Sequence, residues 1–326
     1  MRAAWYEKKG PAREVLTVGE MPDPHPESGE VRIRVTASGV NPGDIKKRDG
    51  WLGSPMPYPR VIPHSDGAGT VDAVGSGVSA SRIGERVFCY GAQSYRPFGT
   101  AAEWVTVPAE QAVRLPEEAS FEIGACLGIP GVTAHRAVFA DGSVRGRTVL
   151  VAGASGAVGS IAATLAAWGG ATVLATVRSP GDADAARRAG AAHVVVLDGS
   201  DVAAAIHRIA PRGVDRIIEV ALGPNAALDA DVLAQGGVLA VYSSPEAEPR
   251  IPFWPLLFNN IVMRFLGSDD FAAADKRRAA DDLVTCVTER RLTVDLAQRF
   301  SLDQIAAAHE AVERPTRPGR VVVMVD

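Results

Sequence analysis

The chain has 326 residues, 47% of them hydrophobic and 22% charged, and its 34 Lys and Arg against 38 Asp and Glu give a formal net charge of −4. This composition is typical of a folded globular protein, and the absence of excess positive charge argues against nucleic acid as a partner. At roughly 150 residues per domain, the length favours two domains.

The first part of the chain, up to about residue 120, is predicted to be rich in short strands. Gly and Pro separate brief apolar runs there, as turn residues do between strands. The expected strands are residues 31–35, 69–74, 86–89 and 103–107. This pattern predicts an irregular, mostly antiparallel sheet or barrel.

From about residue 147 onward, apolar strands alternate with helices. The expected strands are residues 148–152, 172–177, 193–197, 215–220, 237–242 and 261–266, and the expected helices are residues 156–168, 182–189, 201–209 and 225–234. Such alternation is typical of an α/β fold, in which helices cover both faces of a doubly wound parallel sheet.

The last segment returns to a mixed pattern. Residues 301–304 have the Ser-x-x-Gln form of a capping box, which predicts a helix after them, and residues 321–325 predict a final strand. A cofactor-type domain is therefore expected to be inserted into a β-rich domain that holds both ends of the chain.

The cysteines and the apolar runs of the sequence bear on the cellular compartment in which the protein is expected. Cys89, Cys126 and Cys286 lie far apart and form no Cys-x-x-Cys pair, so we expect neither a disulfide framework nor a thiolate-rich zinc site. Charged residues interrupt residues 1–18, unlike a signal peptide, and no run approaches the roughly 18 apolar residues of a membrane span. We therefore expect a cytoplasmic protein without a membrane partner.

The most informative segment, residues 149–159, leads from an apolar strand through a glycine-rich turn into a helix. Its spacing is GxxGxxG rather than the more usual GxGxxG. A backbone without side chains lets a pyrophosphate approach the amides, and the helix N-terminus adds partial positive charge. The alternative is a glycine-rich turn with no ligand, which the further strand–helix units disfavour. The expected cofactor contacts are Gly153, Ser155, Gly156, Ala157 and Val158.

The end of the second strand of this domain distinguishes the two nicotinamide dinucleotides. A site for NAD usually has Asp or Glu about 20 residues after the glycine turn, to bind the ribose 2′-hydroxyl. Arg178 and Ser179 occupy that place here. Because a guanidinium pairs with a 2′-phosphate that a carboxylate would repel, we predict NADPH as the cofactor. The alternative for Arg178 is a solvated surface arginine.

Several segments, taken together, resemble the medium-chain dehydrogenase/reductase superfamily, and within it the zinc-free quinone oxidoreductases of the zeta-crystallin type. These segments are residues 39–44, 63–69, 99–110, 130–137, 153–159, 218–220 and 308–310. The resemblance implies a GroES-like β-rich catalytic domain in residues 1–122, completed by residues 267–326. It implies a Rossmann domain that binds NADPH in residues 123–266, and assembly as a homodimer.

The resemblance also implies roles for particular residues. Asn41 matches an asparagine near the nicotinamide and the substrate, although a turn-forming Asn before a proline would also fit. Thr133 matches a threonine that contacts the nicotinamide, with a hydroxyl lining a helix as the alternative. Lys46 stands where relatives often have a tyrosine, so it either points to solvent or gives the substrate pocket a cationic donor. The remaining implied cofactor contacts are Val220, Tyr242, Ser243, and Arg314 or Arg320.

No metal site is expected. Zinc enzymes of this superfamily carry a Cys ligand where this chain has Val40 and Asn41, and they carry Gly-His-Glu where this chain has His64, Ser65 and Asp66. We interpret His64 as a packing or polar loop residue, because neither the three ligands of a catalytic zinc nor the four of a structural zinc can be assembled.

These inferences predict an NADPH-dependent enzyme that transfers a hydride to quinones. Without a metal to stabilise an alkoxide, alcohol oxidation is disfavoured, whereas a quinone spreads the incoming charge over a conjugated oxygen. An enoyl or 2-alkenal reductase acting on α,β-unsaturated carbonyls is the nearest alternative. A protein that binds NADPH without catalysis is another.

Overall fold

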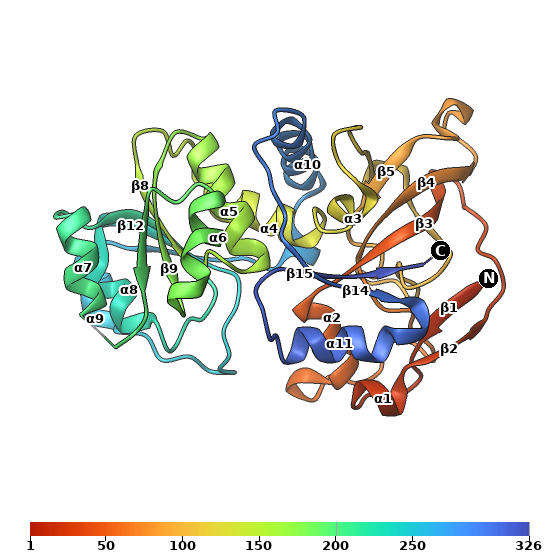
Figure 1. Ribbon diagram of the computed structural model, residues 1–326, viewed down its shortest axis with the longest axis horizontal. Helices are drawn as coiled ribbons and strands as arrows, with labels where there is room; N and C mark the ends of the chain where they lie inside the picture. Colours follow the sequence, from red (N-terminus) through yellow and green to blue (C-terminus); the bar gives the residue numbers. More distant parts are fainter. Residues whose placement is uncertain (200, 326) are drawn as a thin grey trace. The chain divides into compact units, whose positions relative to one another are not determined.

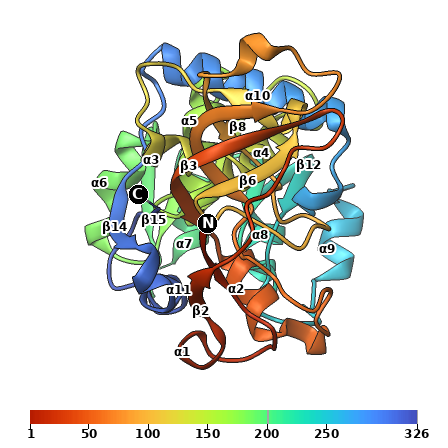
Figure 2. The same ribbon diagram turned by 90° about the vertical axis from the view of Figure 1, so that its right-hand side faces the viewer.

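The computed structural model describes residues 1–199 and 201–325 and divides into two compact units. Unit 1 comprises Met1–Pro130, Lys276–Thr288 and the chain from Val294 onward, so it holds both termini (Figure 2). Unit 2 comprises Gly131–Asp275 and Glu289–Thr293. Each unit is built on its own main sheet.

Unit 1 contains a seven-stranded sheet in the order β14-β15-β3-β4-β5-β7, in which β6 also pairs with β3. The strands are β3 Glu30–Val40, β4 Asp66–Val74, β5 Arg86–Cys89, β6 Trp104–Pro108, β7 Ala112–Arg114, β14 Leu296–Ser301 and β15 Arg320–Met324. The pairs are antiparallel except for β14 and β15, which run parallel. The prediction of a mostly antiparallel sheet is confirmed.

The core of this sheet follows the alternation of the β3 sequence. Val31, Ile33 and Val35 are buried on one face, while Arg32 and Arg34 between them are not, as a strand of period two requires. A separate two-stranded sheet pairs β1 Arg2–Trp5 with β2 Thr17–Glu20. The helices are α1 Ala12–Val15, α2 Pro42–Asp49, α3 Phe121–Gly124, α11 Ile305–Glu313, and α10 Ala273–Thr288 from Lys276 onward.

The predicted capping box is present at the start of the last helix. The backbone N–H of Ser301 donates to the side-chain oxygen of Gln304 over 3.1 Å. The first turn, Leu302–Gln304, is a 3-10 turn, and α11 continues from Ile305. The box therefore marks where the chain leaves β14 and turns into α11.

Unit 2 contains a six-stranded parallel sheet in the order β10-β9-β8-β11-β12-β13. The strands are β8 Thr148–Ala152, β9 Thr172–Val177, β10 His193–Val196, β11 Val214–Glu219, β12 Leu233–Val241 and β13 Val262–Phe265. The helices are α5 Ala157–Trp168, α6 Ala183–Arg188, α7 Val202–Ile209, α8 Ala226–Val232, α9 Phe253–Phe258, and α4 Ile129–Phe139 from Gly131 onward. Helices α5 and α6 cover one face and α7 and α8 the other (Figure 1).

This strand order is that of a Rossmann fold, so the predicted doubly wound domain is confirmed. Within this sheet, the first strand in the sequence is the central β8. The next two strands, β9 and β10, lie on one side of it, and β11 lies on the other side. The carboxyl ends of β8 and β11, where the direction reverses, are the place at which open α/β sheets bind ligands.

One predicted helix is too long. Residues 225–234 were expected to be helical, but α8 ends at Val232, and Leu233 and Ala234 already belong to β12. Leu233 has an extended backbone, and Gly236 has a φ of +72°, which lets the strand bulge before Val238 resumes pairing with Arg216. The apolar residues 233–234 suited the helical period and concealed this early start.

The length and apolar character of the helices bear on whether one could cross a membrane. Within residues 1–199 and 201–325, no helix combines the length and the apolar character that crossing a bilayer requires.

Candidate cofactor and active site

The glycine turn after β8 is tight enough to exclude side chains. Gly153 has a φ of +65°, and a Cβ there would lie 3.3 Å from Cγ1 of Val220. Gly156 caps α5 and donates its N–H to the carbonyl of Gly153 over 2.8 Å. A Cβ on Gly159 would lie only 2.3 Å from that same carbonyl oxygen. The third glycine therefore lets the helix pack against the strand.

This turn fits a pyrophosphate. Ala157 and Val158 form the first turn of α5, where backbone N–H groups have no acceptor within the helix. Ser155, Gly156, Ala157 and Val158 are at least partly accessible, and no carboxylate belongs to the turn. The amides and the positive end of the 12-residue helix are therefore available to an anion.

Arg178 lies where the sequence analysis expected a 2′-phosphate contact. It directly follows β9, is exposed, and makes no hydrogen bond or ion pair with any other described residue. Its neighbour Ser179 donates from Oγ to Asp182 over 2.9 Å. Arg187, on α6, is instead paired with Asp184 at 2.8 Å. Arg178 thus keeps its guanidinium free for a phosphate.

The loops after β11 and β12 bring the other predicted residues of unit 2 beside the glycine turn. Val220 follows β11 and lies against Gly153. The backbone N–H of Tyr242, after β12, donates to the carbonyl of Glu219 over 3.1 Å, and Leu222 donates to the carbonyl of Ser243 over 3.3 Å. The carboxyl ends of β8, β11 and β12 therefore form one continuous cofactor-side edge.

Thr133, the remaining predicted residue of unit 2, lies on α4 and is buried.

In unit 1, Asn41 is held from both ends of its amide. Its Oδ1 accepts from Arg320 over 2.8 Å, and its Nδ2 donates to Asp66 over 2.7 Å. Asn41, Asp66 and Arg320 are all buried. Because an arginine can only donate and a carboxylate can only accept, the orientation of the amide is fixed. Among the described residues, the second N–H of Nδ2 has no acceptor.

The two candidate C-terminal arginines differ in position. Arg320, at the start of β15, is the buried residue that orients Asn41. Arg314 follows α11, is exposed, and donates its backbone N–H to the carbonyl of Glu310 over 2.9 Å.

Two carboxylates of this site were not singled out from the sequence. Asp66 binds Asn41 and also accepts the backbone N–H of Ile129 over 2.7 Å. Asp44, in the first turn of α2, accepts the backbone N–H of Asn41 over 2.7 Å, and burial raises the pKa of its carboxyl to about 7. The Asn-x-x-Asp spacing is the only sequence signal for Asp44, and it also fits an ordinary helix cap.

Lys46 neither extends freely into solvent nor forms an ion pair among the described residues. Its Nζ lies 4.3 Å from the centroid of the Trp51 ring, and the side chain is half-buried. This cation–π contact keeps a positive charge against Trp51, a residue that is 47% exposed.

The residues at the place of the zinc ligands do not fit a metal. His64 uses both ring nitrogens, Nδ1 with Ser38 at 2.8 Å and Nε2 with His309 at 3.0 Å. Both carboxylate oxygens of Asp66 accept hydrogen bonds, as described above. Within the described part of the chain, no three His, Cys, Asp or Glu side chains are grouped so that they could hold a metal ion.

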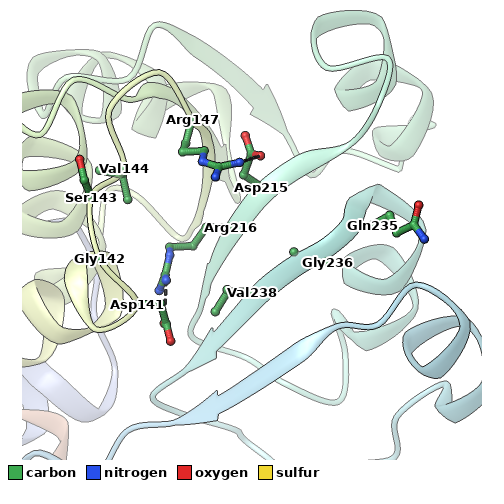
Figure 3. A pocket seen from close by; sticks show the side chains of 11 residues that line it. Asp141, Gly142, Ser143, Val144, Arg147, Asp215, Arg216, Gln235, Gly236 and Val238 are labelled. Atoms are coloured by element: carbon green, nitrogen blue, oxygen red, sulfur yellow. Dashed lines mark hydrogen bonds and ion pairs between the residues drawn. The ribbon is translucent and has the colours of Figure 1, made fainter.

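A polar pocket of about 150 Å³ lies at the opposite, amino ends of β8 and β11 (Figure 3). Its charges neutralise one another: Arg216 donates to Asp141 over 2.7 Å, and Arg147 donates to Asp215 over 3.0 Å. Because every one of these ionic groups already has its counter-charge, we assign this pocket no ligand.

Comparison with known proteins agrees with this arrangement. Residues 27–117 match the family model of the alcohol dehydrogenase GroES-like domain, and residues 157–280 match that of the zinc-binding dehydrogenases. A quinone oxidoreductase of Lama guanicoe is 33% identical over 341 aligned positions, which cover 100% of this chain and 98% of the relative.

Solved structures extend the likeness to the whole fold. An NAD-dependent alcohol dehydrogenase is 27% identical with a TM-score of 0.89, and coverage is 100% of both chains. A mycobacterial protein solved in complex with NADPH is 26% identical with a TM-score of 0.87, again with full coverage of both chains. The same family is indicated by the two domain matches, by the relative that aligns over the full length and by the described geometry. The chain is thus an NAD(P)H-dependent oxidoreductase that belongs to the quinone oxidoreductase type of the medium-chain dehydrogenase/reductase superfamily.

Proposed function

We propose that this enzyme is an NADPH-dependent, zinc-independent reductase that transfers a hydride to quinones. The observation that carries the choice of cofactor is the guanidinium of Arg178 at the end of β9, which pairs with no other residue in the described part of the chain. The engaged ring nitrogens of His64 support the independence from zinc. The name of the Lama guanicoe relative supports the quinone as substrate.

The proposed division of labour follows the sequence-based domain bounds. Residues 1–122 with 267–326 would act on the substrate, and residues 123–266 would bind NADPH. In the first domain Asn41 and Lys46 are the proposed catalytic residues. In the second, the amides of residues 155–158 would bind the pyrophosphate and Arg178 with Ser179 the 2′-phosphate. Thr133, Val220, Tyr242 and Ser243 are proposed to line the nicotinamide end, and Arg314 or Arg320 to face the cofactor.

Asn41 would stabilise the charge that develops on the substrate. Bound NADPH would supply a hydride to an electron-poor carbon, and the negative charge would spread to a conjugated oxygen. The free N–H of Asn41 Nδ2 can donate to that oxygen. Since Arg320 and Asp66 already hold the amide, this donor pays no reorientation cost at the moment of reaction. The ammonium of Lys46 would be a second donor, and water can return the proton.

A substrate panel tests the proposal. Purified enzyme would be given NADPH with 1,4-benzoquinone, with 9,10-phenanthrenequinone, or with α,β-unsaturated ketones and aldehydes, each with and without a chelator. We expect steady NADPH oxidation with the quinones, unchanged by the chelator. Turnover of the enones alone would assign the enzyme to the alkenal reductases. Tight NADPH binding with no turnover would identify a non-catalytic binding protein, and inhibition by the chelator would reject independence from zinc.

We also propose that the enzyme is a cytoplasmic homodimer. All three cysteines are free thiols, which supports a reducing compartment. The edge strand β13 and the adjacent α9 present large exposed apolar side chains, including Phe265 at 68%, Trp254 at 63% and Phe258 at 70% exposure. Large exposed apolar side chains on an open strand edge and on the helix that precedes it in the chain favour pairing with a second copy.

Replacing Phe265 with Lys should separate such a dimer. A lysine on an edge strand disfavours pairing between edges, and it leaves the core intact because Phe265 is already exposed. In sedimentation equilibrium we expect twice the 34.1 kDa chain mass for the wild type and the single-chain mass for the variant. Ile83→Lys, at an exposed position of unit 1, is the control and should remain dimeric. A monomeric wild type, or a dimeric Phe265→Lys, would refute the proposal.

A further inference from the structure

Two carboxyl groups are buried together behind the cofactor-side edge of unit 2. Glu219 is the last residue of β11 and is 0% exposed, and Asp229 lies on α8 and is 1% exposed. Glu219 Oε2 and Asp229 Oδ2 are buried and receive no hydrogen bond from an N–H or O–H group of the described residues, and the two carboxyl side chains interact with each other. Two carboxylates cannot accept from each other, so one of them must carry a proton.

The hydrogen bonds around the pair show which carboxyl carries the proton. Glu219 Oε1 accepts the backbone N–H of Ala221, and it accepts from Asn225 Nδ2 over 3.0 Å. Among the described residues, no N–H or O–H donates to the side chain of Asp229. Glu219 is therefore the charged acceptor and Asp229 the donor. Burial, followed by the charge of Glu219, raises the pKa of Asp229 to about 9, and burial also raises that of Glu219.

The charged member of this pair holds the turn that faces the cofactor. Its bonds to Ala221 and Asn225 fold residues 220–225 back over the end of β11. That turn is tied to the next loop, since Ser244 Oγ donates to the carbonyl of Leu222 over 2.7 Å. At its start, Val220 lies against Gly153 of the phosphate-binding turn. A change at Glu219 would therefore reach the cofactor side directly.

We propose that Glu219 and Asp229 share one proton and act as positioning residues, which hold residues 220–225 in the shape that binds NADPH and release them when the proton is lost. The proposal rests on the proposed NADPH site. With Asp229 protonated, the pair has a single negative charge, which the N–H groups of Ala221 and Asn225 stabilise. A second buried charge would have no counter-charge and would push the two carboxylates, and with them α8 and the turn, apart.

Few other titratable groups face this pair. Tyr242 lies at the end of β12, and burial followed by the charge of Glu219 raises the pKa of its phenol. On α8, two residues after Asp229, Asp231 is 61% exposed and lies 3.7 Å from His207 of α7. Neither group supplies a positive charge that would neutralise a doubly ionised pair at alkaline pH.

The test measures NADPH binding as a function of pH in three proteins. The wild type, Asp229→Asn and Asp231→Asn would be titrated with NADPH by nicotinamide fluorescence between pH 7 and 10. For the wild type we expect Kd to rise about tenfold from pH 8 to pH 10, as the shared proton leaves a group that titrates near 9. Asp229→Asn keeps a donor toward Glu219 but cannot ionise, so its Kd should stay nearly constant. Asp231→Asn is the matched control on the same helix and should follow the wild type.

An infrared spectrum examines the pair without the cofactor. At pH 8 the wild type and Asp231→Asn should show a carbonyl band of a protonated carboxylic acid that is missing from Asp229→Asn, apart from the small band that Asp44 leaves in all three proteins. Absence of the band from the wild type would overturn the proposal even if Asp229→Asn does not fold. A pH dependence of Kd in Asp229→Asn equal to that of the wild type would also overturn it. Failure of the wild type to bind NADPH at pH 7 would instead reject the proposed function and leave the band as evidence for the proton.

Discussion

Between pH 7 and pH 5 the free energy of unfolding should fall by about 2 kcal/mol through His64 alone, with His309 acting in the same direction. Burial lowers the pKa of His64 to about 3 from 6.5, and burial together with His64 and Arg48 lowers that of His309. The folded state therefore excludes protons that the unfolded chain binds. The stabilisation is complete above pH 6.5 and is lost progressively as the pH falls toward 3.

A chain of hydrogen bonds explains why the ring of His64 does not accept a second proton. Thr100 Oγ1 donates to the backbone carbonyl of Asp66 over 2.6 Å, so it must accept from Ser38 Oγ at 2.7 Å. Ser38 has then used its proton and accepts from His64 Nδ1 at 2.8 Å. The unprotonated Nε2 of His64 accepts from Nε2 of His309 at 3.0 Å. A proton added to His64 would meet the N–H of His309.

Chemical denaturation at pH 7 and pH 5 would measure the effect. His309→Gln keeps an N–H for His64 but removes one titrating ring, so its loss of stability between the two pH values should be smaller than that of the wild type. His193→Gln changes an exposed histidine and should reproduce the wild-type loss. Equal losses in all three proteins would show that His309 does not contribute to the acid sensitivity.

Removing the side chain of Arg178 should weaken NADPH binding by about 10- to 100-fold and leave NADH binding nearly unchanged. Charge-assisted hydrogen bonds contribute about 1.5–3 kcal/mol, and 1.4 kcal/mol corresponds to a factor of ten in Kd. Among the described residues the guanidinium has no partner, so the variant would lose only the contact with the 2′-phosphate.

Calorimetric titration of Arg178→Ala with both dinucleotides would test this expectation. Arg187→Ala is the control, since that arginine is already paired with Asp184 and should alter NADPH affinity by less than about threefold. A similar loss of affinity for NADPH and NADH would show that Arg178 does not read the 2′-phosphate.

The fold and half of the candidate site were predictable because their signals are local. The apolar run of β8, the glycines at 153, 156 and 159 and the start of α5 are contiguous, so the sequence predicts the turn as a unit. The position of Arg178 is also set locally, because it directly follows a strand. The end of α8 was missed since Leu233 and Ala234 suit the helix period as well as the strand.

The other half depends on residues that are remote in sequence. Arg320 meets Asn41 across 279 positions, and His309 meets His64 across 245. His64 also adopts a φ of +76°, which is rare outside glycine and which the hydrogen bonds to its ring stabilise. No local pattern distinguishes such residues from ordinary loop side chains. The carboxyl pair of Glu219 and Asp229 likewise depends on the packing of α8 beside β11, which the sequence does not show.

The position of β15 has a consequence for how the protein is made. This strand lies between β14 and β3, so the main sheet of unit 1 lacks an interior strand until residues 320–324 have left the ribosome. Unit 2 is almost wholly contained in residues 131–275 and can complete its sheet earlier during translation. The unit whose synthesis begins first is therefore the last to finish folding. A chain that ended before residue 320 would lack β15 and would leave the edge of β3 that pairs with it open for aggregation.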